Sequence, residues 1–399
     1  MRFAGIDIGS RGHVVAILDD VGATLLRPTP FTADAAGHQL LFDLLGSPAE
    51  LLVALEATGH YGRNLFGALT DRAYLVALIN PLRTRRFAEE DLVRAKTDAV
   101  DALGIARFAA QKRPSPTQVD PALEDLRELV RFHSRLLQDF NARLRQLHRL
   151  VNLCFPEILG PVRTLDSKRA TSLLHEYPTA VSFATASLQE LADLRLSDRR
   201  RVGDKLAQQL IESGRVSVGR HHTPAYSYEV RLVCEDISVL RGRLEDVRSK
   251  IETFVEAHPV GALLSTITGI GSITVGRILA AVGDPARFRS AGALAAYVGV
   301  VPGTNASGLR RPAHAHLSPL GNARLRHALY MATFAAVQRN PWLGTYYQRL
   351  KASGKPPKVA LVATMRKLLC VVYSVAKNRR PFVCPTNLSS PEEGPEAHS

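Results

Sequence analysis

Four acidic residues stand out, because each lies where a negative charge needs a partner. Asp7 interrupts an apolar run near the N-terminus, and Glu56 ends a second apolar run, which reads as a buried strand. An unpaired ionised carboxylate at the end of a buried strand is costly, so each requires a cation or hydrogen-bond donors. Asp98 and Asp101 are three residues apart, a spacing that places both side chains on one face of a helix.

Carboxylate oxygens are the ligands that Mg²⁺ prefers, and four of them could surround one or two such ions. Two magnesium ions are a known device for phosphodiester cleavage, because they activate one oxygen and stabilise the leaving oxygen. Each acid also has a structural interpretation. Asp7 could cap the turn that follows it, and Asp is favoured in the first turn of a helix. The combination of four favours a magnesium site at Asp7, Glu56, Asp98 and Asp101.

A second candidate for chemistry is Ser307, which precedes a glycine in a polar loop and is followed by Arg310 and Arg311. A serine hydroxyl is a poor nucleophile until its proton is removed and the charge on the attacked phosphorus is neutralised. The two arginines, together with Arg324 and Arg326, could bind phosphates for that purpose. Without such a setting, a serine in a loop is a turn former.

A third motif is the sequence Gly-Ile-Gly at Gly269 to Gly271, between two segments with helical periodicity. Such a turn can expose backbone N–H groups at the start of the second helix, where a phosphate is attracted by hydrogen bonds and by the helix dipole. The arrangement resembles a helix-hairpin-helix motif that contacts a nucleic-acid backbone. Many Gly-x-Gly turns merely join helices, and this alternative stays open.

Charge is unevenly distributed along the 399 residues, whose formal net charge is +14. Lys plus Arg against Asp plus Glu number 13 and 13 in residues 1–116, 21 and 20 in residues 117–258, and 17 and 4 in residues 259–399. A region so depleted of carboxylates favours a nucleic-acid partner, since phosphate neutralisation uses many Lys and Arg on one surface.

Composition also bounds where the protein acts. The four cysteines are far apart in the sequence, without the paired spacing of a zinc site or a disulfide framework. We find no signal-peptide pattern and no uncharged stretch long enough to cross a bilayer. We therefore expect a cytoplasmic, nucleoid-associated bacterial protein with no membrane partner.

The elements that must position the four acids lie in residues 1–116, which alternate between strand and helix patterns. Three consecutive strands are predicted, followed by helix, strand, helix, strand and helix. The predicted strands are 3–8, 13–19, 23–31, 51–55 and 74–79, and the last helix contains residues 96–103. This order predicts an α/β domain in which Asp7 and Glu56 both lie at strand ends.

The rest of the chain is predicted to be mostly helical. Residues 117–258 carry apolar side chains at helical spacing in two long stretches, typical of an antiparallel hairpin or coiled coil that acts as a spacer or dimer interface. Within them, the basic triplet Arg199–Arg201 could contact phosphates or be simply solvated. Residues 259–380 form a basic domain with helices, and residues 381–399, rich in Pro, Ser and Glu, predict a disordered tail.

The acidic motifs carry a resemblance to a known family. The string Gly-Ile-Asp-Ile-Gly around Asp7, the segment Ala54–Gly59 and the string Lys-Thr-Asp-Ala-Val-Asp-Ala of Lys96–Ala102 resemble the RuvC/RNase H-like domain of DEDD-type insertion-sequence transposases, of the IS-one-ten and IS-eleven-eleven type. The resemblance implies an RNase H-like (RuvC-like) fold. It also implies that the four carboxylates hold Mg²⁺ at a DNA-cleaving centre.

The basic region resembles the C-terminal domain of the same transposases at Tyr297–Pro302, Ser307–Gly308 and Gly321–Arg326. The resemblance implies that Ser307 attacks DNA and becomes covalently joined to it. It further implies a non-coding bridge RNA that guides recognition of donor and target DNA. Protomers would pair as a dimer or tetramer, so that the serine of one meets the carboxylates of another.

Two other functions remain compatible with the sequence. A RuvC-like, structure-specific DNA endonuclease would use the same carboxylates to activate water and would leave Ser307 idle. A non-catalytic nucleic-acid-binding scaffold would use the acids only structurally, with the Gly269–Gly271 turn gripping the backbone. A covalent protein–DNA adduct distinguishes the recombinase from the nuclease, and a specific divalent-ion site distinguishes either enzyme from the scaffold.

Overall fold

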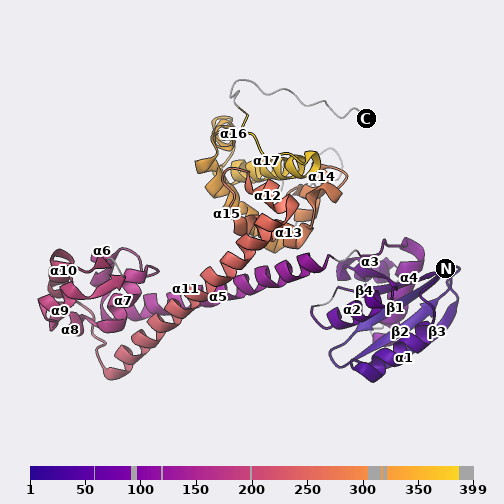
Figure 1. Ribbon diagram of the computed structural model, residues 1–399, viewed down its shortest axis with the longest axis horizontal. Helices are drawn as coiled ribbons and strands as arrows, with labels where there is room; N and C mark the ends of the chain where they lie inside the picture. The colour runs from indigo at the N-terminus through magenta and orange to yellow at the C-terminus, as the bar shows by residue number, and fades with distance from the viewer. Residues whose placement is uncertain are drawn as a thin grey trace. The chain divides into compact units, whose positions relative to one another are not determined.

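The computed structural model divides the chain into two compact units, Met1–Val119 and Asp120–Ser399. It describes residues 1–57, 59–90, 97–117, 120–197, 200–303, 316–317 and 321–385. The first unit contains a mixed sheet with helices, and the second is almost entirely helical (Figure 1).

The first unit is built on a five-stranded sheet of order β3-β2-β1-β4-β5. Its first three strands form an antiparallel meander, whereas β4 pairs parallel with both β1 and β5. The strands are β1 (Arg2–Ile8), β2 (Gly12–Leu18), β3 (Thr24–Thr32), β4 (Leu51–Glu56) and β5 (Leu75–Ile79). The predicted order of three strands, helix, strand, helix, strand and helix is therefore present, with a further helix before the last.

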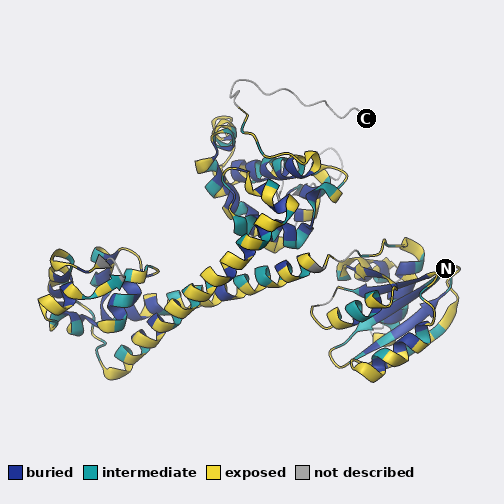
Figure 2. Cartoon of the chain, in the orientation of Figure 1, coloured by how far each residue is buried: buried dark blue, intermediate teal, exposed yellow. Residues whose placement is uncertain are grey.

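Helices cover both faces of this sheet, because side chains along a strand alternate between its faces. Ala4 and Ile6 of β1 pack into one apolar cluster with α1 (Ala35–Leu45) and α2 (Arg63–Asp71). Phe3 faces the opposite cluster, formed with α3 (Pro81–Glu90) and α4 (Asp98–Lys112). The three inner strands, β1, β2 and β4, are consequently buried from both sides (Figure 2).

The second unit is organised on two long helices, α5 (Pro121–Cys154) and α11 (Pro224–Ala257). They pack antiparallel, since the Arg149 side chain near the end of α5 pairs with Glu229 near the start of α11, Nη2 to Oε1 at 2.9 Å (Figure 1). Asp120 caps α5 by accepting a hydrogen bond from the amide of Ala122. The predicted role of this pair in dimerisation stays a prediction.

Between the two long helices, residues 156–223 form a small lobe, which we call the connecting lobe. Its apolar core contains Phe155, Phe183 and Leu210 and also holds the near ends of α5 and α11. The elements of the connecting lobe are η1 (Pro156–Ile158), α6 (Leu159–Val162), α7 (Lys168–Glu176), α8 (Ala180–Ala184), α9 (Leu188–Asp193), β6 (Arg195–Ser197), β7 (Arg200–Arg201) and α10 (Asp204–Arg215).

The C-terminal helices pack with the opposite ends of α5 and α11 into a second apolar core. The elements are α12 (Pro259–Ser265), α13 (Ser272–Val282), η2 (Pro285–Arg287), α14 (Ala291–Val298), β8 (Pro302–Gly303), β9 (His316–Leu317), α15 (Ala323–Arg339), α16 (Pro341–Ala352) and α17 (Pro357–Asn378). Among the helices of the described ranges, α17 alone is long and apolar enough to cross a membrane. It is a core helix, because Met365, Leu368 and Val372 are fully buried in this cluster.

The segment predicted to be a disordered tail, residues 381–399, lies mostly outside the described residues. Its first residues are described, and the amide of Phe382 donates a hydrogen bond to Oγ1 of Thr266 at 2.8 Å. The chain leaving α17 is therefore tied to the turn between α12 and α13.

Candidate functional site

The register of the sheet places Asp7 and Glu56 on neighbouring strands at the same edge. Ile6 of β1 lies opposite Leu55 of β4 in a parallel pair, so the following residues, Asp7 and Glu56, lie side by side at the carboxyl ends of both strands. By strand alternation, Asp7 shares a face with Phe3 and Gly5, and this is the face that α4 covers. Both carboxylates therefore lie on the α4 side of the sheet.

Gly5 allows α4 to approach β1 closely. A Cβ atom at Gly5 would lie 2.2 Å from the amide nitrogen of Ala106 and 2.4 Å from the carbonyl oxygen of Ala102. No side chain fits in that space. The contact sets the distance between α4 and β1. It also brings Asp101, which precedes Ala102, toward the end of β1 that carries Asp7.

The start of α4 carries the other two acids. Oγ1 of Thr97 caps the helix by accepting a hydrogen bond from the amide of Val100 at 3.3 Å. Asp98 and Asp101 occupy the first turn, where the helix dipole favours negative charge. Asp98 is exposed and Asp101 half-buried. We call Asp7, Glu56, Asp98 and Asp101 the acidic edge.

The electrostatics of Asp7 show that the members of the acidic edge interact. The pKa of Asp7 is raised to about 6, chiefly by burial and then by the charges of Asp101, Asp98 and Glu56, in that order of size. Only a hydrogen bond from the amide of Ile8 lowers it. A bound cation would reverse the effect of the three like charges, so the charge pattern suits a cation.

Glu56 has a partner that the sequence analysis missed. The hydroxyl of Thr84, a buried residue of α3, donates a hydrogen bond to Oε1 of Glu56. This contact orients the carboxylate and draws α3 toward the end of β4. No motif marks Thr84 in the sequence. Gly5 was equally missed as a packing residue, although a glycine inside an apolar strand is a signal for close backbone approach.

The donor chemistry of the acidic edge fits magnesium, since all four groups are carboxylates. In the part of the chain that the structure describes, no three Asp, Glu, His or Cys side chains are gathered tightly enough to hold one metal ion. The other three acids are thus near enough to raise the pKa of Asp7. Binding an ion requires the four side chains to converge further.

The Gly269–Gly271 turn joins α12 to α13, as its predicted position between two helices requires. Gly269 has φ +99° and packs so tightly on α15 that a Cβ would lie 2.6 Å from Cα of Ala336. Ser272, the first residue of α13, donates its hydroxyl to Oε1 of Glu252 at 2.7 Å. A carboxylate thus lies at the start of α13, where the motif predicts a phosphate.

The predicted phosphate-binding arginines have different surroundings. Arg324 is exposed at the start of α15. Arg326 is half-buried, and its Nη1 donates a hydrogen bond to the carbonyl of Val298 at 3.3 Å, which connects α15 to α14. Ser307, Arg310 and Arg311 lie outside the described residues.

Comparison with known families matches both halves of the chain. Residues 4–156 match a family model described as a transposase, of the DEDD IS110 type. Residues 261–348 match a family model described as transposase of the IS116/IS110/IS902 family. The first match contains all four members of the acidic edge, and the second contains Ser307.

Relatives resemble the chain over most of its length. It is 26% identical to the insertion element IS110 uncharacterized 43.6 kDa protein of Streptomyces coelicolor, with 94% of each chain covered. It is 28% identical to the mini-circle putative transposase for IS117 of the same organism, with 95% of each covered. A pilin gene-inverting protein of Moraxella lacunata is 26% identical, with 83% of this chain and 82% of the relative covered. The chain belongs to the IS110 family of insertion-sequence transposases.

Proposed function

We propose that this protein is a DNA recombinase that cuts and rejoins the DNA of an insertion sequence through a covalent serine–DNA intermediate. In this proposal Asp7, Glu56, Asp98 and Asp101 bind Mg²⁺, and Ser307 is the nucleophile. The observation that carries it is the raised pKa of Asp7 at the end of a buried strand, caused first by burial and then by the charges of Asp101, Asp98 and Glu56.

The order β3-β2-β1-β4-β5 supports an RNase H-like fold for the first unit. In such a sheet the antiparallel meander is followed by parallel strands, so that β1 lies centrally and its end is flanked by β4 and α4. The position of Asp7 on β1 lets it interact with acids from both neighbours, as the causes of its raised pKa indicate.

Each residue has a role in the proposed reaction. Magnesium, when bound, supplies positive charge that activates an oxygen and stabilises the leaving oxygen of a phosphodiester. The acids orient the scissile phosphate against Ser307. The Ser307 Oγ–phosphorus bond forms as one phosphorus–oxygen bond of the DNA backbone breaks, and the serine proton goes to the departing oxygen. Arg310, Arg311 and Arg324 neutralise phosphate oxygens.

The proposal includes partners beyond the donor and target DNA. A bridge RNA would select both DNAs, and a dimer or tetramer would bring Ser307 of one protomer to the acidic edge of another. The pilin gene-inverting relatives support recombination as the reaction class, because inversion of a gene is a rearrangement of DNA. These features enter here as implications of family membership.

Asp101→Ala tests the metal centre. We expect it to abolish Mg²⁺-dependent strand cleavage of element DNA, measured on denaturing gels, because Asp101 is the carboxylate whose charge most perturbs Asp7. The matched control is Asp20→Ala, which removes an exposed acid from the turn after β2 and should leave cleavage unchanged. Undiminished cleavage by Asp101→Ala would show that the quartet is wrongly assigned.

Ser307→Ala tests the nucleophile. We expect the covalent protein–DNA adduct, trapped by denaturation, to disappear while DNA binding persists. Persistence of the adduct would refute the assignment of Ser307. Cleavage without any adduct in the unsubstituted protein would instead favour a RuvC-like endonuclease. Absence of a divalent-ion site in calorimetry, together with normal DNA binding, would favour a non-catalytic scaffold.

A further inference from the structure

The connecting lobe contains a hollow whose charged lining residues are mainly basic. Two adjoining depressions, of about 750 and 410 Å³, share Pro161, Arg169 and Leu196 as common walls. We call them together the lobe hollow. Its cationic side chains come from three separate segments and are Arg163, Lys168, Arg169, Arg201 and Lys205. One carboxylate, Asp204, also belongs to the described lining.

Most of these cations have no acidic partner. Arg201 pairs with Asp193, with Nη1 and Oδ1 2.6 Å apart. Among the described residues, no ion pair involves the side chains of Arg163, Lys168 or Lys205, and all three are exposed. Five cations that gather around one hollow with a single carboxylate repel one another, and an anion placed there relieves that repulsion.

The positions of the cations are set by the buried core beneath them. Val162, Ala170 and Val202 are buried next to Arg163, Arg169 and Arg201 in the chain. The backbone that carries the cations is therefore anchored, although the side chains reach outward. The lining also contains Gly203, whose φ is +78° and which begins α10 without a side-chain cap. The first amides of α10 thus add hydrogen-bond donors beside the lobe hollow.

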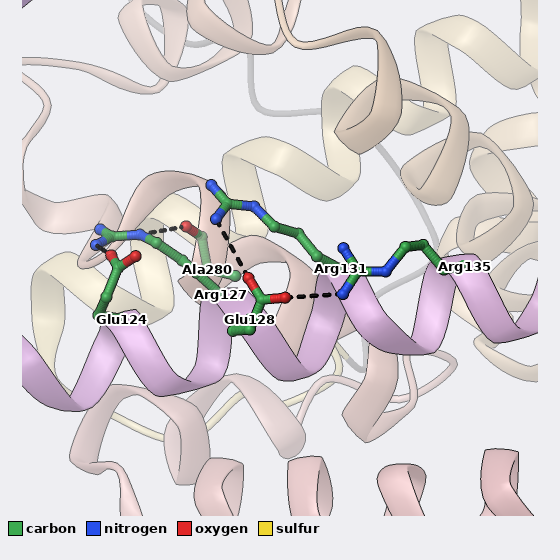
Figure 3. Close-up of polar contacts among 6 residues, drawn as sticks. All are labelled: Glu124, Arg127, Glu128, Arg131, Arg135 and Ala280. Atoms are coloured by element: carbon green, nitrogen blue, oxygen red, sulfur yellow. Dashed lines mark hydrogen bonds and ion pairs between the residues drawn. The ribbon is translucent and has the colours of Figure 1, made fainter. Parts of the chain in front are cut away.

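The arginines at the start of α5 differ from the cations of the lobe hollow, because their charges are paired (Figure 3). The Arg127 Nε donates a hydrogen bond to the carbonyl of Ala280 on α13 at 3.0 Å, and its Nη1 pairs with Glu124. Glu128 pairs with both Arg131 and Arg135. Arg127 thus connects α5 to α13, and all three arginines are neutralised by glutamates of the same helix. The basic character of the lobe hollow is therefore not a general feature of this arginine-rich chain.

We propose that the lobe hollow is a binding site for the phosphate backbone of a nucleic acid. Its cations, located directly after α6, on α7 and in the β7–α10 segment, neutralise several successive phosphates rather than one. The contacts would be independent of base sequence, because they involve phosphate oxygens only. The site lies between the segments matched by the two family models, residues 4–156 and 261–348, so neither match assigns it a role.

The choice of a nucleic acid over a small anion rests on the proposed function, since a recombinase must hold long stretches of backbone. The shape agrees with this choice. The hollow consists of two adjoining depressions, and its basic residues point from an exposed surface rather than into an enclosed cavity. A small organic ligand, by contrast, is usually enclosed among apolar and aromatic side chains.

The test uses the full chain with three exposed cations replaced together, Arg163→Gln, Lys168→Gln and Lys205→Gln. A matched triple variant, Arg215→Gln, Arg243→Gln and Lys250→Gln, removes the same charge from exposed positions of the same unit that do not line the hollow. The probes are a fluorescent 30-base-pair DNA duplex and 30-nucleotide DNA and RNA strands. Binding is followed by fluorescence anisotropy between 50 and 300 mM NaCl.

We expect the hollow variant to bind at least one probe roughly tenfold more weakly than the unsubstituted chain. We also expect the slope of log K against log salt to become shallower by about 2 to 3, the loss of three phosphate contacts. The matched variant should lose less than threefold. Equal losses in both triple variants, or no loss in either, overturn the inference.

Two further measurements separate the alternatives. If inorganic phosphate protects the unsubstituted chain against thermal unfolding but not the hollow variant, and every oligonucleotide binds both equally, the occupant is a small anion and the inference fails. Failure of the proposed function appears differently, as an absence of Mg²⁺-dependent cleavage by the unsubstituted chain. That result leaves the difference in oligonucleotide affinity between the two triple variants unaffected. Thermal unfolding of both variants checks that they are folded.

Discussion

The acidic edge and the lobe hollow both gather like charges, but the two regions hold them differently. At the acidic edge, short carboxylates are carried by elements packed without any intervening side chain, as Gly5 of β1 against α4 shows. At the lobe hollow, long cationic side chains extend from an anchored backbone into solvent. The first arrangement perturbs a pKa, whereas the second leaves the charges free to move apart.

This difference indicates that charge repulsion lowers stability mainly where packing prevents the charges from separating. A half-buried carboxylate near three others is held in an unfavourable field, because the packing of β1, β4 and α4 prevents separation. An exposed Lys or Arg lowers its repulsion by rotating its side chain and by attracting counter-ions. Charge removal should therefore stabilise the first region and leave the stability of the second nearly unchanged.

The largest expected effect comes from breaking the packing that creates the acidic edge. Gly5→Val forces new atoms against the backbone of Ala102 and Ala106, so α4 must move away from β1. We expect a loss of about 3 kcal/mol in the free energy of unfolding, measured by urea denaturation. The control is Gly104→Ala on the same helix, where a Cβ meets nothing within 4 Å. That change should stabilise by about 0.5 to 1 kcal/mol. An equally small effect of both substitutions would show that the close approach does not position α4.

The next effect comes from neutralising Asp7. Its folded-state pKa of about 6 exceeds the ordinary value of 3.8, so between these pH values the folded form keeps a proton that the unfolded form loses. The stability of the unsubstituted chain should therefore fall as the pH rises from 4 to 6 and stay lower above that range. Asp7→Asn should remove this fall and gain on the order of 1 to 2 kcal/mol at pH 7, allowing for partial solvent screening.

The measurement for Asp7 is a series of urea denaturations from pH 4 to pH 8, with Asp20→Asn as the exposed control. Parallel curves for Asp7→Asn and the unsubstituted chain would contradict a raised pKa at Asp7. A stabilisation at pH 7 that is absent at pH 4 would support it, because at pH 4 the folded unsubstituted chain keeps Asp7 protonated and therefore uncharged, as asparagine is.

A smaller effect is expected from adding the cation itself. Magnesium at several times its dissociation constant should stabilise the unsubstituted chain by about 1 kcal/mol, since a ligand of the folded state stabilises by mass action. The double variant Asp98→Asn and Asp101→Asn should lose this response. Thermal unfolding with MgCl₂, against NaCl of equal ionic strength, measures it. An identical response from the double variant would place the magnesium effect outside the acidic edge.

The smallest effect is expected at the lobe hollow. The triple variant Arg163→Gln, Lys168→Gln and Lys205→Gln should change the free energy of unfolding by less than about 0.5 kcal/mol, because exposed charges contribute little. Urea denaturation at 50 mM NaCl tests this. A large stabilisation would erase the distinction between the two regions, since it would show that the cations are held together as rigidly as the acids.

The predicted elements of the first unit followed from local pattern. The apolar runs of β1 and β4, and a helix that contains Asp98 and Asp101, are predicted from the sequence and are present in the structure. Helices were equally readable in the second unit, where α5 and α11 carry apolar residues at helical spacing. These features depend on neighbours in the chain, so one sequence suffices to predict them.

Contacts between distant segments were not predictable in the same way. The hydrogen bond from Thr84 to Glu56 joins residues 28 positions apart, and the bond from Ser272 to Glu252 puts a carboxylate where a phosphate was predicted. The lobe hollow combines side chains from three segments, and Arg169 and Lys205 have no sequence motif in common. Such arrangements depend on which faces pack together.

The sequence by itself determined that acids lie at strand ends and at a helix start, because alternation and helix capping are local properties. It also determined the family, through strings around Asp7 and Asp101 that match known transposases. Only the tertiary structure decided that α4 lies against Gly5 and that the charges of three other carboxylates therefore raise the pKa of Asp7. Only the tertiary structure, likewise, decided that cations of the connecting lobe share one hollow. The physical reason is that an electrostatic field depends on distance in space, and packing sets that distance.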